Sequence, residues 1–333
     1  MRLRRWGAIL TNAIIIVILG LLTAWAAAAL YLDLHLAWLR LPAAVLYLAA
    51  MVGCGILLRG RWIAVASVAA GFVLVLLWWL SLRPSNNRSW QPDVARRAWA
   101  EIDGDRVTLH NLRDCDYRTE FDYTCQWETR TVDLSRLRGV DLFLTYWGSP
   151  WIAHPIVSFD FGGGNHVAMS IETRKQVGED YSAFRGFFRQ YELIYIISDE
   201  RDLIRLRSNY RTGEDVYLFH TKASPQVARA LFLEYLERIN RMRDTPEWYN
   251  ALTNNCTTNI SVMTAAAQGI HPRWDWRILF NGRADQMLYQ RGDLAGDLPY
   301  AELKAKAYIN PAAKAAGEAP DFSQQIRAGR PGF

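Results

Sequence analysis

Cys256 is the residue best placed to do chemistry, because it begins a segment with the composition of a helix. The segment from Cys256 to Gln268 holds three consecutive alanines and is followed by Gly269, a residue typical of helix ends. Asn254, Asn255 or a neighbouring threonine supplies a side chain that can cap the first turn. Free N–H groups and the helix dipole favour a thiolate at this position, so Cys256 is a candidate nucleophile.

A thiol nucleophile needs a nearby base, and the segment from His166 to Arg174 offers one. Its pattern predicts a strand, in which alternate residues face the same side. One side carries apolar residues that we expect to point to the core. We expect His166, on the other side, to be the base. The side chains that we expect to position substrate or support the site are Ser170, Glu172, Arg174 and Asn255.

The group that orients the histidine is not assigned by this pattern. Glu172 lies six residues from His166, roughly 20 Å along an extended strand, so it cannot touch that imidazole unless the strand bends sharply. His154, which precedes Pro155, is the alternative base.

Two classes of function have little support in the sequence. The six histidines and four cysteines show no HxH, HExxH or CxxC spacing, so we expect no metal site and no cofactor. The formal charge of +5 comes from basic residues scattered among acidic ones, and we expect no nucleic-acid partner.

The first 82 residues contain three apolar runs, at about residues 7–32, 37–58 and 62–82. Each is long enough to cross a bilayer, which takes about 20 apolar residues. Since two further runs follow the first, we do not expect a removed signal peptide. Arginines precede the first run and occupy the turn between the second and third. By the positive-inside rule, these places face the cytoplasm and everything after residue 82 lies outside it.

The cysteines agree with an exported domain. Cys115 and Cys125 flank a stretch that predicts a hairpin loop, and an oxidising compartment would allow them to form a disulfide. Cys54 lies in the second apolar run, where a small apolar packing role is expected. Cys256 is then left as the odd cysteine, as expected for a nucleophile.

The rest of the chain predicts an α+β domain with an antiparallel sheet followed by helices. We expect a membrane anchor over residues 1–82, a linker over 83–92, a catalytic domain over 93–298 and a tail over 299–333. The tail predicts a helix around residues 301–307 and disorder in the last dozen residues. Gly162–Asn165 predicts a turn between two strands at 156–161 and 166–174.

Several segments resemble a signature of the Lnb-type periplasmic domain of bacterial membrane proteins. They are Phe159–Phe161, Asn165–Arg174, Arg189–Tyr195, Asp202–Arg211 and Trp248–Asn259. The resemblance covers about residues 120–290 and implies a circularly permuted papain-like (NlpC-like) fold, in which the histidine strand precedes the cysteine helix. It implies Cys256 as nucleophile and His166 as base, in the periplasm. The positive-inside rule then puts the N-terminus on the cytoplasmic side of the inner membrane.

Characterised members of this family are described as lipoprotein N-acyltransferases. The resemblance therefore implies an acyl chain moved from membrane phospholipid, through a thioester on Cys256, to the amine of a lipoprotein N-terminus. Two alternatives stay open. One is a cell-wall peptidase or amidase that uses the same pair of residues. The other is a membrane-tethered binding module with an inert Cys256.

Overall fold

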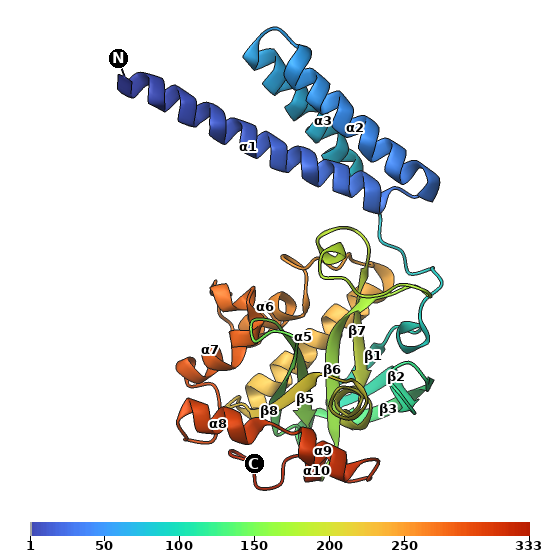
Figure 1. The fold of residues 1–333 in the computed structure, drawn as a ribbon. Helices are drawn as coiled ribbons and strands as arrows, with labels where there is room; N and C mark the ends of the chain where they lie inside the picture. Colours follow the sequence, from blue (N-terminus) through green and yellow to red (C-terminus); the bar gives the residue numbers. More distant parts are fainter. Residues whose placement is uncertain (1) are drawn as a thin grey trace. The chain divides into compact units, whose positions relative to one another are not determined.

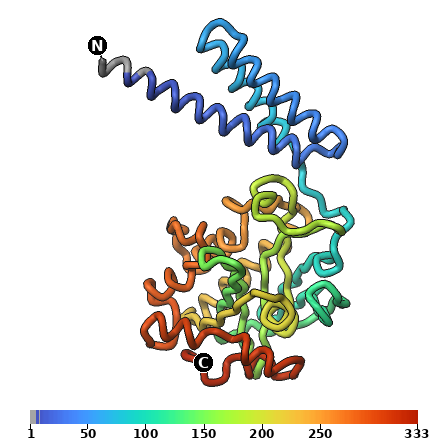
Figure 2. Tube along the Cα trace, in the orientation of Figure 1, coloured from blue at the N-terminus to red at the C-terminus, as the bar shows by residue number. Residues whose placement is uncertain are grey.

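The computed structural model describes residues 2–333 and divides into two compact units, which are treated separately. The first unit comprises the chain up to Ser85 together with the loop Ser182–Tyr191. Its three long helices are α1 (Arg2–Asp33), α2 (Ala37–Leu57) and α3 (Arg61–Ser81), which follow one another in Figures 1 and 2. Each contains a segment long and apolar enough to cross a membrane. These segments are Ile9–Asp33, Ala37–Leu57 and Arg61–Ser81, with mean hydropathies of 2.6, 1.8 and 2.4. The three predicted spans are confirmed.

The loop Ser182–Tyr191 belongs to this unit because its side chains pack on the helices. Gln190 donates a hydrogen bond to Oδ1 of Asp33 (2.6 Å), and Trp79 donates one to Oδ2 of Asp33 (2.8 Å). Phe188 stacks on Trp25, with ring centroids 6.2 Å apart. A segment far along the chain is therefore fixed to the ends of α1 and α3.

The second unit comprises residues 86–181 and 192–333 and is built on an eight-stranded sheet. The strands are β1 (Trp99–Asp103), β2 (Arg106–Tyr117), β3 (Tyr123–Asp133), β4 (Gly139–Trp147), β5 (Ala153–Asp160), β6 (His166–Arg174), β7 (Glu192–Ser198) and β8 (Glu214–His220). Their order is β1-β2-β7-β6-β5-β4-β8, with β3 paired to β2. Pairing is antiparallel except between β2 and β7, so the predicted α+β class with an antiparallel sheet is confirmed.

Helices follow the sheet, as predicted, except for the first, which lies between β7 and β8. They are α4 (Glu200–Arg205), α5 (Pro225–Asp244), α6 (Cys256–Ala267), α7 (Ala284–Arg291), α8 (Tyr300–Ala307), α9 (Asn310–Ala316) and α10 (Phe322–Gln325). A π-helical turn, η4 (Leu206–Tyr210), continues α4. Short 3-10 turns occur at Pro92–Val94, Leu134–Arg136, Arg185–Phe187, Trp276–Ile278 and Asn281–Arg283.

Both faces of the sheet are buried. On one face Phe159 of β5 packs edge-on against Phe232 and Tyr235 of α5, with centroids 4.9 and 5.8 Å apart. On the other, Ala168 of β6 joins a core that includes Ile204 of α4. At Ala168, this side of β6 is therefore covered by helices.

The end of the chain is ordered and packs into this second core. Phe322 and Ile326 are completely buried, and Figure 1 places α10 beside α9. The Arg327 guanidinium forms buried ion pairs with Asp141 (2.7 Å) and Glu200 (2.6 Å). The structure thus differs from the predicted disorder of the last dozen residues, because apolar side chains and a paired arginine anchor them. The domain extends through residue 333 rather than ending at 298.

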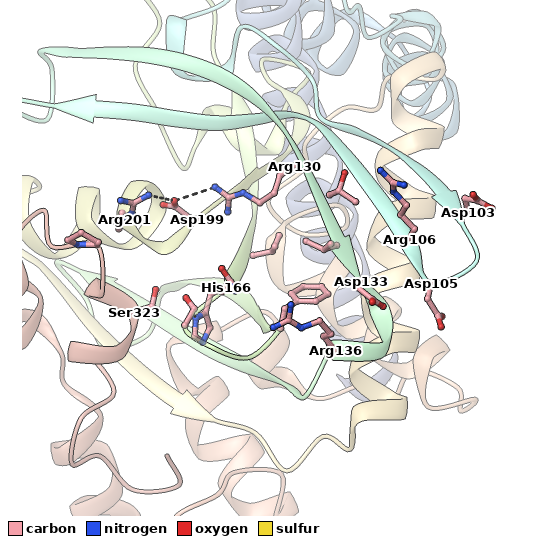
Figure 3. Close-up of a pocket in the computed structure, with 17 residues that line it drawn as sticks. Asp103, Asp105, Arg106, Arg130, Asp133, Arg136, His166, Asp199, Arg201 and Ser323 are labelled. Carbon is pink, nitrogen blue, oxygen red and sulfur yellow. Dashed lines mark hydrogen bonds and ion pairs between the residues drawn. The ribbon is translucent and has the colours of Figure 1, made fainter.

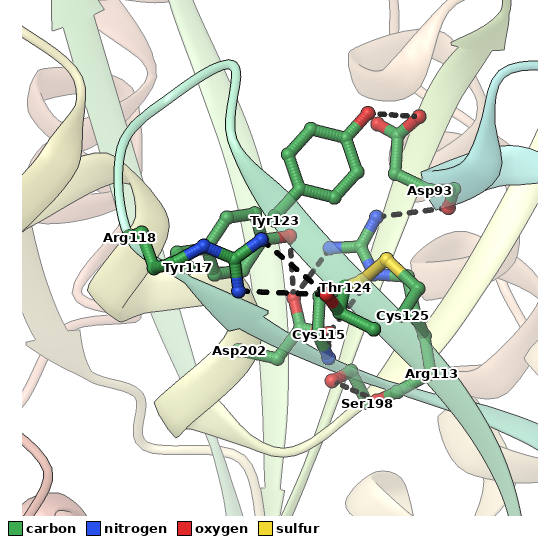
Figure 4. The surroundings of a disulfide bond; sticks show 10 residues. All are labelled: Asp93, Arg113, Cys115, Tyr117, Arg118, Tyr123, Thr124, Cys125, Ser198 and Asp202. Carbon is green, nitrogen blue, oxygen red and sulfur yellow. Dashed lines mark hydrogen bonds and ion pairs between the residues drawn. A yellow bond between two sulfur atoms is a disulfide. The ribbon is translucent and has the colours of Figure 1, made fainter.

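The predicted disulfide is present between β2 and β3 (Figure 4). Cys115 and Cys125 lie directly opposite each other, so the loop of the hairpin is shorter than the stretch they flank. The backbone N–H of Cys115 donates to the Asp202 carboxylate (2.9 Å), which also forms a buried ion pair with Arg113 (2.6 Å). The disulfide therefore joins the hairpin beside a buried ion pair that links β2 to α4.

Candidate active site

Cys256 is the first residue of α6, and a reciprocal cap fixes this helix start. The Asn255 side chain accepts a hydrogen bond from Thr258 N (2.9 Å), while the Thr258 hydroxyl accepts one from Asn255 N (2.9 Å). This capping box stabilises the first turn and leaves the N–H groups of Cys256 and Thr257 outside the helical ladder. The predicted helix and the cap at Asn255 are confirmed.

The β5–β6 hairpin decides which histidine reaches this helix. Its turn contains three consecutive glycines with positive φ (77°, 64° and 82°), a conformation that favours glycine. The turn sets Asp160 opposite His166 and Ile156 opposite Ser170. Counting two residues further along each strand brings His154 opposite Glu172.

His154, Ser170 and Glu172 form one hydrogen-bonded group. The Nε2 atom of His154 lies 2.7 Å from the Ser170 hydroxyl and 3.1 Å from Oε1 of Glu172. Ser170 donates to Oε1 of Glu172 (2.6 Å). The Cys256 side chain interacts with the same imidazole and helps to raise its pKa. Because Nε2 is occupied, Nδ1 is the ring nitrogen available to the thiol.

Charge stabilises the protonated form of this histidine. Burial disfavours the imidazolium, but the Glu172 carboxylate outweighs burial and raises the pKa of His154 to about 9. Burial alone would raise the pKa of Glu172, but His154 and Arg207 hold it well below its ordinary value. Arg207, buried in the π-helical turn, donates to Oε1 of Glu172 (2.9 Å) and also pairs with Glu214 (3.4 Å).

The structure places His166 elsewhere, which corrects the prediction that it lies beside Cys256. His166 is six residues beyond the level of Glu172 and His154 on the same sheet, a separation of roughly 20 Å. Its Nδ1 atom lies 3.2 Å from the Gly164 carbonyl, and its Nε2 atom 3.8 Å from Asp160.

The surroundings of His166 form a cavity of about 1060 Å³, and Figure 3 shows its charged lining. Within this cavity Asp199 pairs with both Arg130 (3.6 Å) and Arg201 (3.0 Å). His166 thus belongs to a polar region away from the thiol, whereas the alternative base, His154, contacts it.

Only some of the other predicted site residues lie at the thiol. Ser170 and Glu172 lie at the thiol, as partners of His154 rather than of His166. Arg174 lies beyond them, where it donates to the carbonyls of Val94 (2.9 Å) and Ala95 (2.8 Å). Over residues 2–333, no group of three His, Cys, Asp or Glu side chains is arranged to hold a metal ion.

Asn281 links the two reactive residues and was not predicted. Its amide donates to the Thr257 hydroxyl (2.7 Å), next to Cys256, and its side-chain oxygen accepts from Ala153 N (2.8 Å), next to His154. A polar residue in a short 3-10 turn gives no signal in the sequence. Arg207 was missed for a similar reason, since only the π-helical turn aims it at Glu172.

Two tyrosines complete the surroundings of the thiol. Burial, together with the charge of Cys256, raises the pKa of both Tyr235 and Tyr249. Within residues 2–333 the Tyr235 hydroxyl is buried and has no hydrogen-bond partner. A buried phenol without a partner near a thiol is available to a reacting group.

Comparison with known proteins identifies the domain. Residues 123–282 match the family model of the Lnb N-terminal periplasmic domain. This segment belongs to that family. The match includes β4 to β8, α5 and α6, and therefore His154, Glu172 and Cys256 of the Lnb domain. No curated protein and no solved structure matched the chain significantly.

The family and the helices together define the class of protein. The Lnb domain is periplasmic, and three apolar helices precede it. The chain is therefore a membrane-anchored protein with a periplasmic domain. A disulfide between Cys115 and Cys125 agrees with that compartment.

Proposed function

We propose that the Lnb domain is a cysteine acyltransferase that takes an acyl chain from a phospholipid ester and delivers it to an amine. The observation that carries this proposal is the contact between the Cys256 thiol, at the start of α6, and His154, which Glu172 holds. A nucleophile, a base and an orienting carboxylate are the parts that covalent acyl transfer needs.

The resting site holds the imidazole of His154 in its charged form. With a pKa of about 9, His154 is protonated at neutral pH. A positive imidazolium and a helix N-terminus both favour the thiolate of a neighbouring cysteine. Glu172 keeps its own charge because Arg207 and His154 lower its pKa.

In the first step, the Cys256 thiolate attacks the carbonyl carbon of a lipid ester. A C–S bond forms and the ester C–O bond breaks, and the leaving alkoxide takes the proton from His154. The products are a thioester on Cys256, a lysophospholipid and a neutral His154.

In the second step, an amine attacks the thioester carbonyl. The C–N bond forms, the C–S bond breaks, and His154 takes the proton that the amine loses. This restores the thiolate and the imidazolium. The acceptor we propose is the N-terminal amine of a lipoprotein, as the resemblance to lipoprotein N-acyltransferases implies.

Both steps pass through a tetrahedral intermediate with a negative oxygen. The backbone N–H groups of Cys256 and Thr257 at the helix start are candidate donors to this oxygen. Tyr235 supplies a third candidate, because its hydroxyl is buried and has no partner within residues 2–333.

The anchor supports a lipid donor. Three membrane helices keep the domain close to a bilayer, which raises the effective concentration of lipid esters. We propose that the membrane is the inner membrane, with Arg2, Arg4, Arg5, Arg59 and Arg61 on its cytoplasmic side.

Trapping the thioester tests the proposal. The full-length protein is mixed with phospholipid that carries a radioactive acyl chain, and the protein-bound label is measured before and after hydroxylamine, which cleaves thioesters. We expect hydroxylamine-sensitive label on the wild type and none on Cys256→Ala or Cys256→Ser. Equal labelling of Cys256→Ala would refute the proposal.

Two further measurements separate the alternatives. Release of peptides from peptidoglycan fragments by the wild type, without lipid-derived label, would favour a peptidase or amidase. Failure of Cys256 to react with iodoacetamide near neutral pH, in folded protein, would favour the inert binding module.

A further inference from the structure

Large apolar side chains gather at the surface beside Cys256. The residues Trp151, Ile152, Trp274, Trp276, Leu279 and Phe280, here termed the aromatic rim, are all at least 42% exposed, and Trp274 is 78% exposed. Single exposed apolar residues are ordinary, but a contiguous set on a soluble domain marks a surface that binds something. Three members touch one another: the ring centroids of Trp151, Trp276 and Phe280 lie 6.1–6.5 Å apart.

The rim is held in place by its backbone. Gly282 donates a hydrogen bond to the Trp151 carbonyl (2.9 Å), and its own carbonyl accepts one from the Tyr146 hydroxyl (3.0 Å). A Cβ atom at position 282 would collide with the backbone of Pro150 to Ile152, so only glycine permits this approach of the two loops. The exposure of the rim is therefore part of the folded structure.

The same loops carry the reactive residues. Ile152 is two positions before His154, and Phe280 directly precedes Asn281, whose side chain bonds Ala153 N and the Thr257 hydroxyl. A molecule that rests on the rim is thus next to the Cys256 thiol.

The chemistry of the rim fits a lipid interface. Tryptophan is enriched where membranes meet water, because its ring is apolar and its N–H polar. Residues 270–291 contain four arginines and two aspartates, and one of these, Asp285, is buried against Lys304 (2.7 Å). Arg283 lies over the Trp151 ring, 4.8 Å from its centroid. Arginines around an aromatic surface complement anionic head groups.

We propose that the aromatic rim docks into the boundary between head groups and acyl chains of a bilayer that contains anionic phospholipid. The exposed tryptophans insert among the lipids, and Arg273 and Arg283 contact phosphate groups, whereas Arg277 and Arg291 pair with Asp275 (2.8 and 3.5 Å). This deepens the proposed function, since it explains how a lipid ester reaches Cys256, but the docking itself does not need the thiol.

Site-directed fluorescence tests the docking in the full-length protein. Cys54→Ala and Cys256→Ala remove the free thiols, and Trp276→Cys then provides one site for an environment-sensitive NBD label. The protein is reconstituted in vesicles of phosphatidylcholine and phosphatidylglycerol, with or without nitroxide lipid labelled near the head group. The matched control carries the label at Phe121→Cys, another exposed aromatic position, in the loop between β2 and β3.

We expect the label at position 276 to show blue-shifted emission and several-fold stronger nitroxide quenching than the label at position 121. Quenching should weaken when phosphatidylglycerol is left out. Equal quenching at the two positions would overturn the proposal, as would a response at position 276 only after a lipoprotein peptide is added. Phe280→Cys repeats the measurement if Trp276→Cys lowers the melting temperature.

The fluorescence result is independent of the acyl chemistry, because the labelled variant carries Cys256→Ala. If the rim docks but the wild type forms no thioester, the docking proposal stands and the acyltransferase proposal is refuted. If the wild type forms the thioester but the rim does not dock, the acyltransferase proposal stands and the docking proposal is refuted.

Discussion

The Nε2 atom of His154 lies 3.1 Å from Oε1 of Glu172, across two neighbouring strands that a glycine turn holds in register. This contact fixes the ring so that its second nitrogen is available to Cys256. It also explains why a carboxylate that is too far along the strand to orient His166 is nonetheless part of the site.

Replacement of the two histidines should have very different effects. His154→Ala removes the group that holds and moves the proton, so thioester formation should fall by about 10²–10⁴-fold. His166→Ala changes a residue roughly 20 Å away and should leave the rate within a few-fold of the wild type. The rate of thioester labelling in the two variants is the measurement. A larger loss of labelling rate in His166→Ala than in His154→Ala would indicate that His166 is the base.

Loss of the Glu172 charge should lower the pKa of His154. Glu172→Gln keeps the shape of the side chain but leaves Arg207 beside the imidazole, so His154 loses its proton at lower pH. Alkylation of Cys256 by iodoacetamide at pH 7 should then slow by at least about tenfold, the factor that corresponds to one pKa unit. The control is Glu214→Gln, which removes another partner of Arg207 without touching His154. An unchanged pH profile in Glu172→Gln would contradict this role.

The same titration should appear in the stability of the fold. The pKa of His154 is raised to about 9 in the folded protein, above an ordinary value of about 6.5. Protonated His154 therefore stabilises the fold fully below about pH 6.5, and this contribution disappears as the pH rises through about 9. The melting temperature of the wild type should fall over that interval, and that of His154→Ala should fall less. Parallel curves for the two proteins would count against a raised pKa.

Gly282 should tolerate no side chain. In Gly282→Ala the new methyl group would lie within 2.7 Å of Ile152 N and closer still to the Pro150 carbonyl. Overpacking of this kind costs about 1–3 kcal/mol and would push apart the loops next to His154 and Cys256. We expect a lower melting temperature and slower thioester formation. Gly139→Ala, whose Cβ would make only an ordinary contact at 3.6 Å, should change neither.

Arg327 should be essential for the stability of the domain. Arg327→Met leaves Asp141 and Glu200 buried without their partner, which should cost about 3–5 kcal/mol in the free energy of unfolding. Burial opposes the charge of Glu200, but Arg327 lowers its pKa to about 2. The wild type should therefore lose stability as the pH falls from about 4.5 to 2, and its advantage over the variant should shrink there.

The control for this substitution is Arg330→Met, three residues away. The Arg330 side chain donates to the carbonyl of Ile326 (2.6 Å) rather than to a carboxylate, so its loss should cost much less. Urea unfolding of both variants in detergent provides the comparison. A wild-type midpoint for Arg327→Met would mean that the last residues contribute nothing to the core.

Local patterns were enough to predict most elements. The strand from His166 to Arg174 and the helix start at Cys256 agree with the structure to the residue. Both depend on neighbours in the chain: alternating side chains in one case, and the Asn255 cap in the other. The pattern predicts a strand that begins at residue 156, because Pro155 is typical of a strand boundary, whereas β5 begins at Ala153.

Because of this three-residue difference at the start of β5, the predicted strand does not include His154. A strand that begins at Ala153 brings His154 opposite Glu172, because the pairing of Asp160 with His166 fixes every other pair in the hairpin. Counting back from the Gly162–Asn165 turn was possible from the sequence alone. The roles of Asn281 and Arg207 were not, since each bonds residues 24 or more positions away through irregular backbone.

The sequence by itself determined the three membrane helices, the disulfide, the sheet-and-helix class and the position of the cysteine at a helix start. These features follow from composition and local periodicity, which are properties of residues close together in the chain. Only the tertiary structure decided which histidine meets the thiol, which carboxylate holds it, and that the chain's end completes a core. Those outcomes depend on strand register and on buried ion pairs. Both bring together residues that are distant in the chain.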